Sequence, residues 1–319
     1  MRILMVGAGA VGGLFGGLMA AAGRDVTFLL RPRRAAQVRE DGLTIVGGPG
    51  LPDVDDENGV TVGVPVLTAD ELAQATAFDV VVLATKAYGL ESAIADLAPA
   101  VDAGAAVLPL LNGMRHVDRL LAEFGDAAVL GGYAYVSSYL DGTGRVLAGP
   151  VAPSITYGER DGSDSERIRG FDAAAQGCGF SATLTTEVTA QMWAKWVFLA
   201  AFAGTNVLSG GTLGQASRAP GGKQTAAALL AETASVAAAA GHRPSDRKLA
   251  RDLQILTDED SGNRASMDKD RLAGRPVEDD AIIGDLVERA ERAGLDVPLL
   301  RATRMALGVY RSQRESAAG

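Results

Sequence analysis

The sequence has few of the residues that build disulfide frameworks and metal sites, and it has no long apolar run. A single cysteine, Cys178, excludes an intramolecular disulfide, and the two histidines, His116 and His242, have no spacing typical of a zinc site. The formal charge of -9 argues against a nucleic-acid partner. The most apolar later run, 196–203, is far shorter than the roughly 20 residues that cross a bilayer.

The N-terminal apolar run enters a glycine turn and lacks the pattern of a signal peptide. We therefore expect a cytoplasmic protein with no structural metal, no nucleic-acid partner and no membrane association.

The first part of the chain alternates between strand-like and helical patterns. A length of 319 residues with 47% hydrophobic residues favours two domains. Buried strands are expected at 3–6, 25–30, 80–84, 105–110 and 128–130. Strand-like pieces at 44–46 and 60–66 flank a segment rich in Gly, Pro and Asp, which is expected to be a surface hairpin or flap. The closing edge of the sheet is expected at 146–147, 154–157 and 181–184, with a helix at 165–176. This alternation predicts a parallel sheet covered by helices.

The strand pattern ends near residue 187, and alanine-rich helical segments follow. Helices are expected at about 187–208, 223–241, 245–259, 278–293 and 298–313. Gly294 and Pro298 mark the end of one helix and the first turn of the next. The fold class is therefore an α/β Rossmann domain at 1–185, followed by an all-α domain at 186–319.

A glycine turn follows the first strand and opens a helix, which is the context that a dinucleotide-binding GxGxxG motif requires. Gly7 allows the tight turn, Gly9 lets the backbone approach a pyrophosphate, and Gly12 permits close packing of helix and strand. The helix N-terminus at Ala10 and Val11 supplies amide groups and a positive dipole end. The alternative is a glycine turn that serves packing alone.

Arginine stands where an NAD site usually has an acidic residue. The second strand ends Leu-Leu-Arg-Pro-Arg-Arg, with Arg31 directly after it. A guanidinium suits a 2′-phosphate, so Arg31, helped by Arg33 or Arg34, points to NADPH. The alternative is a solvated run of charge.

Further segments in this order complete a family pattern. They are Thr85-Lys86-Ala87, Asn112-Gly113-Met114, Trp193-Ala194-Lys195, and Ser266 with Glu278 twelve residues later. With the glycine turn and Arg31, the chain resembles the 2-dehydropantoate 2-reductase, or ketopantoate reductase, family. The resemblance implies that NADPH reduces a 2-oxo acid in a cleft between the two domains, as in pantothenate biosynthesis.

The chemistry needs a group that protonates the carbonyl oxygen when hydride arrives. Lys195 fits this role because its apolar helical surroundings should lower its pKa, although it could instead extend out from a buried helix. The resemblance gives Glu278 a positioning role, Asn112 a place near nicotinamide and substrate, and Ser266 the substrate carboxylate. Lys86 follows a strand and could meet the cofactor or an anionic substrate.

The helix that follows Lys195 departs from the family pattern. We expect asparagines four and eight residues on, but Leu199 and Ala203 stand there. The loss of these polar groups predicts a larger or more apolar carbonyl substrate than ketopantoate. Asn206 could restore some polarity, and His116 is either an additional donor in the cleft or an ordinary surface histidine.

Two other functions use the same layout. One is a dehydrogenase of an imine or amino-acid adduct, and the other is a non-catalytic protein that binds or senses NADPH. The retained Lys195 and Glu278 argue against a sensor, since binding alone needs neither. Alanine-rich helices of the second domain would also allow a homodimer.

Overall fold

The computed structural model describes residues 1–318 and divides into two compact units. The first consists of residues 1–111 and 116–189, and the second of residues 112–115 and the chain from 190 onward. The main division lies close to the predicted boundary after residue 185. Within the described residues, none of the helices combines the length and apolar character needed to cross a bilayer.

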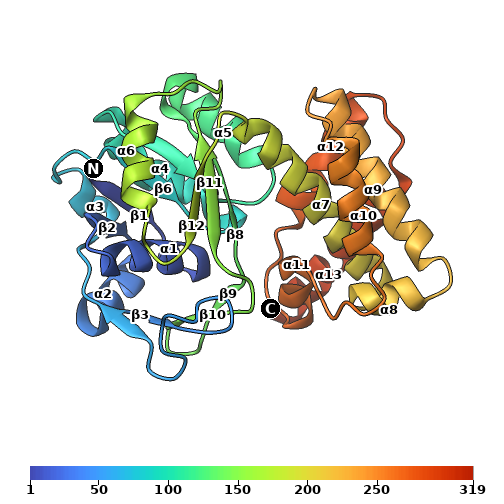
Figure 1. The fold of residues 1–319 in the computed structure, drawn as a ribbon, viewed down its shortest axis with the longest axis horizontal. Coiled ribbons are helices and arrows are strands. Elements are labelled where there is room, and N and C mark those ends of the chain that lie inside the picture. Colours follow the sequence, from blue (N-terminus) through green and yellow to red (C-terminus); the bar gives the residue numbers. More distant parts are fainter. Residues whose placement is uncertain (319) are drawn as a thin grey trace. The chain divides into compact units, whose positions relative to one another are not determined.

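A five-stranded parallel sheet forms the centre of the first unit (Figure 1). Its order is β5-β2-β1-β6-β7, so the chain runs outward from β1 first in one direction and then in the other. The strands are β1(Ile3–Val6), β2(Val26–Leu29), β5(Val66–Leu67), β6(Val80–Leu83) and β7(Ala106–Pro109). This is the Rossmann arrangement, and ligands of such sheets bind at the carboxyl ends of the strands where the order reverses.

Both faces of this sheet are buried because successive residues of a strand point to opposite sides. Ile3 and Met5 belong to the core that contains residues of α1(Ala10–Ala21), whereas Leu4 and Val6 pack with residues of α4(Leu90–Asp102). Because both faces of the sheet are buried, its strands consist of consecutive apolar residues, as the sequence predicted.

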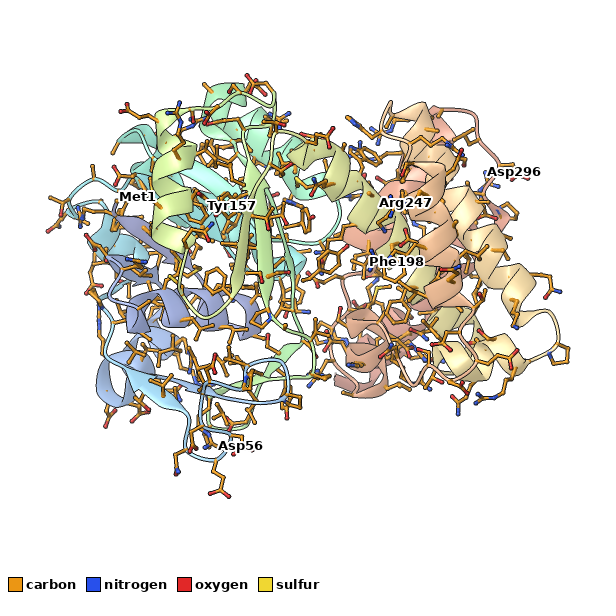
Figure 2. All side chains as sticks on the ribbon, viewed as in Figure 1. Met1, Asp56, Tyr157, Phe198, Arg247 and Asp296 are labelled. Atoms are coloured by element: carbon orange, nitrogen blue, oxygen red, sulfur yellow. The ribbon has the colours of Figure 1, made fainter. Side chains whose placement is uncertain are left out.

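The remaining strands of the first unit form two smaller sheets. One has the order β4-β3-β10-β9, and the other the order β12-β11-β8. Their strands are β3(Leu43–Val46), β4(Val60–Val62), β9(Ser138–Leu140), β10(Val146–Ala148), β8(Gly131–Tyr135), β11(Ser154–Gly158) and β12(Ser181–Leu184). Tyr157 of β11 is labelled in Figure 2. It packs edge-on against Phe171 of α6(Glu166–Ala175) and donates a hydrogen bond to Asp172.

Three strand predictions need correction. The predicted strand 60–66 ends at Val62, and Val66 begins β5 of the main sheet, because Gly63 and Pro65 interrupt the ladder between them. Of the predicted strand 128–130, Ala128 is the last residue of the 3-10 turn η2(Asp126–Ala128), and Val129 forms a single bridge to Val107 of β7. The strands 154–157 and 181–184 belong to a separate sheet and not to the edge of the main one.

Other helices of the first unit are α2(Pro32–Asp41), α3(Ala69–Leu72), the 3-10 turn η1(Ala87–Gly89) and α5(Arg115–Phe124). The second unit is helical. Its elements are α7(Val188–Ser209), which begins two residues before the unit, α8(Leu213–Arg218), α9(Gly222–Ala239), α10(Asp246–Leu256), α11(Ser266–Leu272), the π-helical turn η3(Asp280–Gly284), α12(Asp285–Arg292) and α13(Pro298–Ala318).

Helix α9 packs against α8, α10, α12 and α13. Helix α12 is followed by Gly294, which has a positive φ, and α13 begins with Pro298, as predicted. The short helices α8 and α11 were not separated in the sequence pattern, because one or two turns are too short to show a helical period.

Candidate active site

The glycine turn between β1 and α1 leaves room for a phosphate group. Gly7 has a φ of 97°, which favours glycine, and a Cβ on Gly12 would lie 2.1 Å from the Gly7 carbonyl oxygen. A Cβ on Gly9 would meet nothing within 4 Å, and no side chain caps the N-terminus of α1. The amides that begin α1, including those of Ala10 and Val11, therefore border open space at the positive end of the helix dipole, which fits a pyrophosphate.

The arginines after β2 have different roles. Arg31 is exposed at the start of α2, and its Nη2 donates to Ser92 Oγ at 3.0 Å. Ser92 in turn donates to the Gly89 carbonyl at 3.1 Å, so a hydroxyl of α4 holds the guanidinium beside the end of β6.

Arg34 does not stay available for a ligand. Its Nη2 donates to the carbonyls of Ala8 at 3.3 Å and Gly144 at 2.8 Å, and its Nη1 donates to Gln37 at 2.7 Å. Arg34 therefore ties the glycine turn to the β9–β10 hairpin, and of the two predicted helpers only Arg33 remains exposed.

Two further predicted residues follow neighbouring strands of the parallel sheet. Lys86 is exposed directly before η1, after the carboxyl end of β6. Asn112 follows β7, and its Oδ1 accepts a hydrogen bond from Lys195 Nζ at 2.9 Å. Gly113 has a φ of 83°, as expected for an Asn-Gly turn.

Lys195 is a buried cation on the largely apolar helix α7. Desolvation by burial lowers the pKa of Lys195 to about 8, while the negative charge of Glu278 acts in the opposite direction. Glu278 is half-buried and lies two residues before η3. The second unit therefore brings Asn112, Lys195 and Glu278 together from three separate segments, and it poises a lysine for proton transfer near neutral pH.

Asn206 has a structural role and does not have the predicted role of adding polarity to the substrate site. Its side chain is fully buried, its Oδ1 accepts from the Ala265 amide at 2.8 Å, and its Nδ2 donates to the Gly211 carbonyl at 2.9 Å. Because both ends of the amide serve the backbone, it does not restore polarity for a ligand. It fixes the residue before Ser266, which is the exposed first residue of α11.

The other predicted residues of the substrate site differ in exposure. Leu199 is half-buried, whereas Ala203 is fully buried among the side chains around α7. His116 is buried in α5 and belongs to the first unit, so it is not an ordinary surface histidine. Binding of substrate by these residues stays a prediction.

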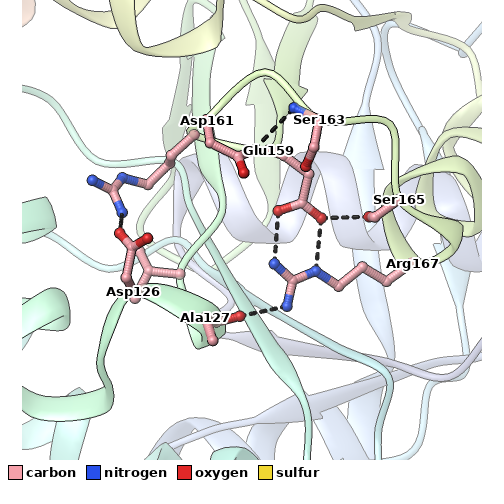
Figure 3. A pocket seen from close by; sticks show the side chains of 9 residues that line it. Asp126, Ala127, Glu159, Asp161, Ser163, Ser165 and Arg167 are labelled. Atoms are coloured by element: carbon pink, nitrogen blue, oxygen red, sulfur yellow. Dashed lines mark hydrogen bonds and ion pairs between the residues drawn. The ribbon is translucent and has the colours of Figure 1, made fainter.

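A hollow of about 170 Å³ on the first unit is not a comparable site. Figure 3 shows that Arg167 donates to the Glu159 carboxylate, at 2.6 and 2.7 Å. Arg160 pairs with Asp126, and Asp161 accepts from the Ser163 amide. Ser165 donates to the same Glu159 carboxylate. These charges are already compensated, so the hollow offers structural ion pairs and no reactive group.

Comparison with known proteins agrees with the chemistry of these residues. The family model of ketopantoate reductase PanE/ApbA matches residues 3–162, and the model of its C-terminal part matches residues 187–309. The chain is similar to the uncharacterized oxidoreductase YkpB of Bacillus subtilis, with 33% identity over 98% of this chain and 100% of that protein. It is 28% identical to a 2-dehydropantoate 2-reductase of Halobacterium salinarum, over 94% of this chain and 96% of the relative.

The fold gives the same assignment. The crystal structure of a 2-dehydropantoate 2-reductase from Geobacter metallireducens matches with a TM-score of 0.82 and 25% identity, over 97% of this chain and 99% of that one. The chain therefore belongs to the ketopantoate reductase family of oxidoreductases, which act on a ketone or the corresponding alcohol.

Proposed function

We propose that this protein uses NADPH to reduce a 2-oxo acid to the 2-hydroxy acid, with Lys195 as the proton donor. The observation that carries the proposal is the buried Lys195 ammonium, which donates to Asn112 at 2.9 Å and has a pKa lowered to about 8. A protein that only binds a nucleotide has no need for a desolvated lysine, and such a lysine is costly to bury.

The residues divide the work of a carbonyl reduction among them. NADPH, when bound, supplies hydride to the carbonyl carbon. Lys195 Nζ gives its proton to the carbonyl oxygen as negative charge develops there, and the Asn112 amide restricts where the ammonium can point. The Glu278 carboxylate favours the protonated lysine, so the acid form is retained at neutral pH.

The choice of NADPH over NADH rests on Arg31 and Ser92. An exposed guanidinium held at 3.0 Å by a neighbouring hydroxyl loses less side-chain entropy when it pairs with a 2′-phosphate. No acidic side chain stands at this position to receive the ribose hydroxyls of NADH.

The substrate class follows from what surrounds the proton donor. Ser266 is exposed and offers its hydroxyl to the carboxylate, while Leu199 presents an apolar surface one helical turn after Lys195. We infer a 2-oxo acid whose side chain is apolar, branched or aromatic in place of the hydroxylated chain of ketopantoate. The proposal requires that the glycine turn of the first unit and Lys195 of the second act on the same reactants.

A kinetic comparison tests this function. Wild-type protein is assayed by the loss of NADPH absorbance with ketopantoate and with 2-oxo acids that carry apolar side chains. We expect at least one apolar substrate to give a kcat/KM near or above roughly 10⁴ M⁻¹s⁻¹ and to exceed ketopantoate. The variant Lys195→Met should lose about 10²- to 10⁴-fold in kcat while it binds NADPH as the wild type does.

Lys223→Ala is the matched control, because Lys223 pairs with Glu259 on the surface of the second unit. It should keep wild-type kinetics. Equal turnover of Lys195→Met and the wild type would remove Lys195 from the mechanism. A wild-type protein that binds NADPH but reduces none of the acids would favour a binding or sensing role, and preference for ketopantoate would refute the inferred substrate class.

A further inference from the structure

The π-helical turn η3 begins two residues after Glu278, and one of its carbonyls accepts a hydrogen bond from a side chain of α7. A π turn is wider than an α-helical turn, and such turns are frequent at functional sites. The indole Nε1–H of Trp196 donates to the Ile282 carbonyl of η3 at 2.9 Å, and both residues are fully buried. Trp196 is the residue after Lys195, so the helix of the proton donor is bonded to the turn that follows Glu278.

A second contact reaches the same turn from the Asn112 side. A Cβ on Gly113 would lie 2.3 Å from the Ala281 carbonyl oxygen of η3 and 3.7 Å from Trp196 Nε1. Only a residue without a side chain fits this close approach, and its φ of 83° also favours glycine. The backbone next to Asn112 therefore packs directly on the segment that Trp196 holds.

The indole ring is held on its other sides as well. The Arg289 guanidinium lies 5.6 Å from the Trp196 ring centroid and pairs at 3.1 Å with the buried Asp285, the first residue of α12. Arg115 approaches the same Asp285 carboxylate at 4.0 Å. These charged groups compensate one another and fix the ring against the helix that continues from η3.

We propose that Trp196 is a positioning residue of the active site, whose indole N–H holds η3 so that Glu278 stays beside Lys195. Asn112, Lys195 and Glu278 come from separate segments of the chain. Gly113 follows Asn112 and Trp196 follows Lys195, and both contact η3, the turn that follows Glu278. The role in catalysis rests on the proposed function, whereas the effect on Lys195 itself does not.

The variant Trp196→Phe removes the N–H and keeps an aromatic ring. When Glu278 moves away, the Lys195 ammonium loses a stabilising negative charge, so the Lys195 pKa should fall by roughly half a unit or more. The direct measurement is an NMR titration of lysine-labelled protein, which is practical because the sequence has five lysines. The falling limb of kcat against pH should move to lower pH by the same amount.

Trp193→Phe is the matched control. Trp193 is buried on the same helix, and its ring stacks on His242 at 5.4 Å. It also lies 5.1 Å from the Trp196 ring and 5.4 Å from the Arg289 guanidinium, so Trp193→Phe changes the packing of the same cluster but keeps the Trp196 N–H that bonds Ile282. This variant should lose stability as Trp196→Phe does and leave the Lys195 titration unchanged. If both variants shift the titration equally, or neither shifts it, Trp196 has a packing role only and the inference is overturned.

A double-mutant cycle with Glu278→Gln assigns the effect to that carboxylate. In the Glu278→Gln background, Trp196→Phe should no longer shift the Lys195 pKa, and a full shift there would contradict the inference. If Trp196→Phe does not fold, Gly113→Ala replaces it, since the added Cβ must displace the Ala281 carbonyl. An absence of reductase activity would refute the proposed function, while the titration would still decide this inference.

Discussion

Lys195 shows how a single residue acquires its chemistry from burial. Its side chain is buried on an apolar helix, and removal of the ammonium from water disfavours the charged form. The sequence predicted this shift from the apolar run around the lysine. It could not predict the bond to Asn112, since residues 83 positions apart meet only through the tertiary fold.

The pH dependence of the reaction should reveal this lysine. Reduction requires the protonated form, so kcat/KM for the 2-oxo acid should fall as pH rises through about 8. Oxidation of the hydroxy acid requires the neutral amine, so its rate should rise through the same pH. Both profiles are measured by nicotinamide absorbance. If the rates of reduction and of oxidation change in the same direction with pH, a group other than Lys195 controls the pH dependence.

Cofactor preference should depend on Arg31 and on the Ser92 hydroxyl, which no sequence pattern singled out. Arg31→Ala should lower kcat/KM for NADPH by about 10- to 100-fold and leave NADH nearly unchanged, because a charge-assisted contact is worth roughly 1.5–3 kcal/mol. Ser92→Ala should lower the preference for NADPH by a smaller factor, since the guanidinium then has more freedom.

Ser92→Thr keeps the hydroxyl and should restore the ratio of NADPH to NADH efficiency. Direct binding of NADP⁺ and NAD⁺ by calorimetry gives the same comparison without turnover. A Ser92→Ala protein whose ratio equals that of the wild type would show that the bond to Arg31 at 3.0 Å has no part in selectivity.

At the scale of elements, the sequence predicted those with a long and unambiguous pattern. The β1–α1–β2 unit, the strands β6 and β7, and the helices α7, α9, α10 and α13 agree with their predicted positions within a few residues. Strands and helices of this length can be predicted from sequence, because the residue propensities, the hydrophobic period and the residues at their ends all indicate the same element.

The elements that the sequence did not predict depend on tertiary contacts. The π turn η3 was read as part of one helix over 278–293, yet its geometry is stabilised by the Trp196 indole from another helix. Tertiary contacts also determine the role of Asn206, which the sequence did not predict. A buried asparagine in an apolar helix suggested polarity toward a ligand, whereas the amide pairs with the backbone of Gly211, five residues on, and of the distant Ala265.

Replacement of Asn206 should loosen the loop that carries Ser266. Asn206→Leu leaves the Ala265 amide and the Gly211 carbonyl without their partner, so the free energy of unfolding should fall by about 2–4 kcal/mol. KM for the 2-oxo acid should rise more than kcat falls. Urea unfolding and steady-state kinetics measure the two effects.

Asn263→Ala serves as the control, because the Asn263 side chain is exposed in the same segment. Its stability should change by less than about 0.5 kcal/mol. An Asn206→Leu protein as stable as this control would mean that water or a neighbouring group replaces the amide.

At the scale of the whole molecule, fold and chemistry could be predicted further than the substrate. The order of motifs along the chain sufficed for the family. The predicted site residues that follow β1, β2, β6 and β7 lie at the strand ends where Rossmann sheets bind ligands, and they are Gly7, Arg31, Lys86 and Asn112. Substrate choice depends on a few side chains such as Leu199, whose neighbours come from distant segments. A sequence pattern does not place those neighbours.

The central claim is that this protein transfers hydride from NADPH to the carbonyl carbon of a 2-oxo acid. The direct measurement uses NADPH deuterated at C4 of the nicotinamide, with the best apolar 2-oxo acid as substrate and NMR detection of the product. We expect a 2-hydroxy acid with deuterium on carbon 2 and, in the Lys195→Met variant, slow formation of the same product. A product without deuterium on that carbon, or no hydroxy acid at all, would contradict the central claim.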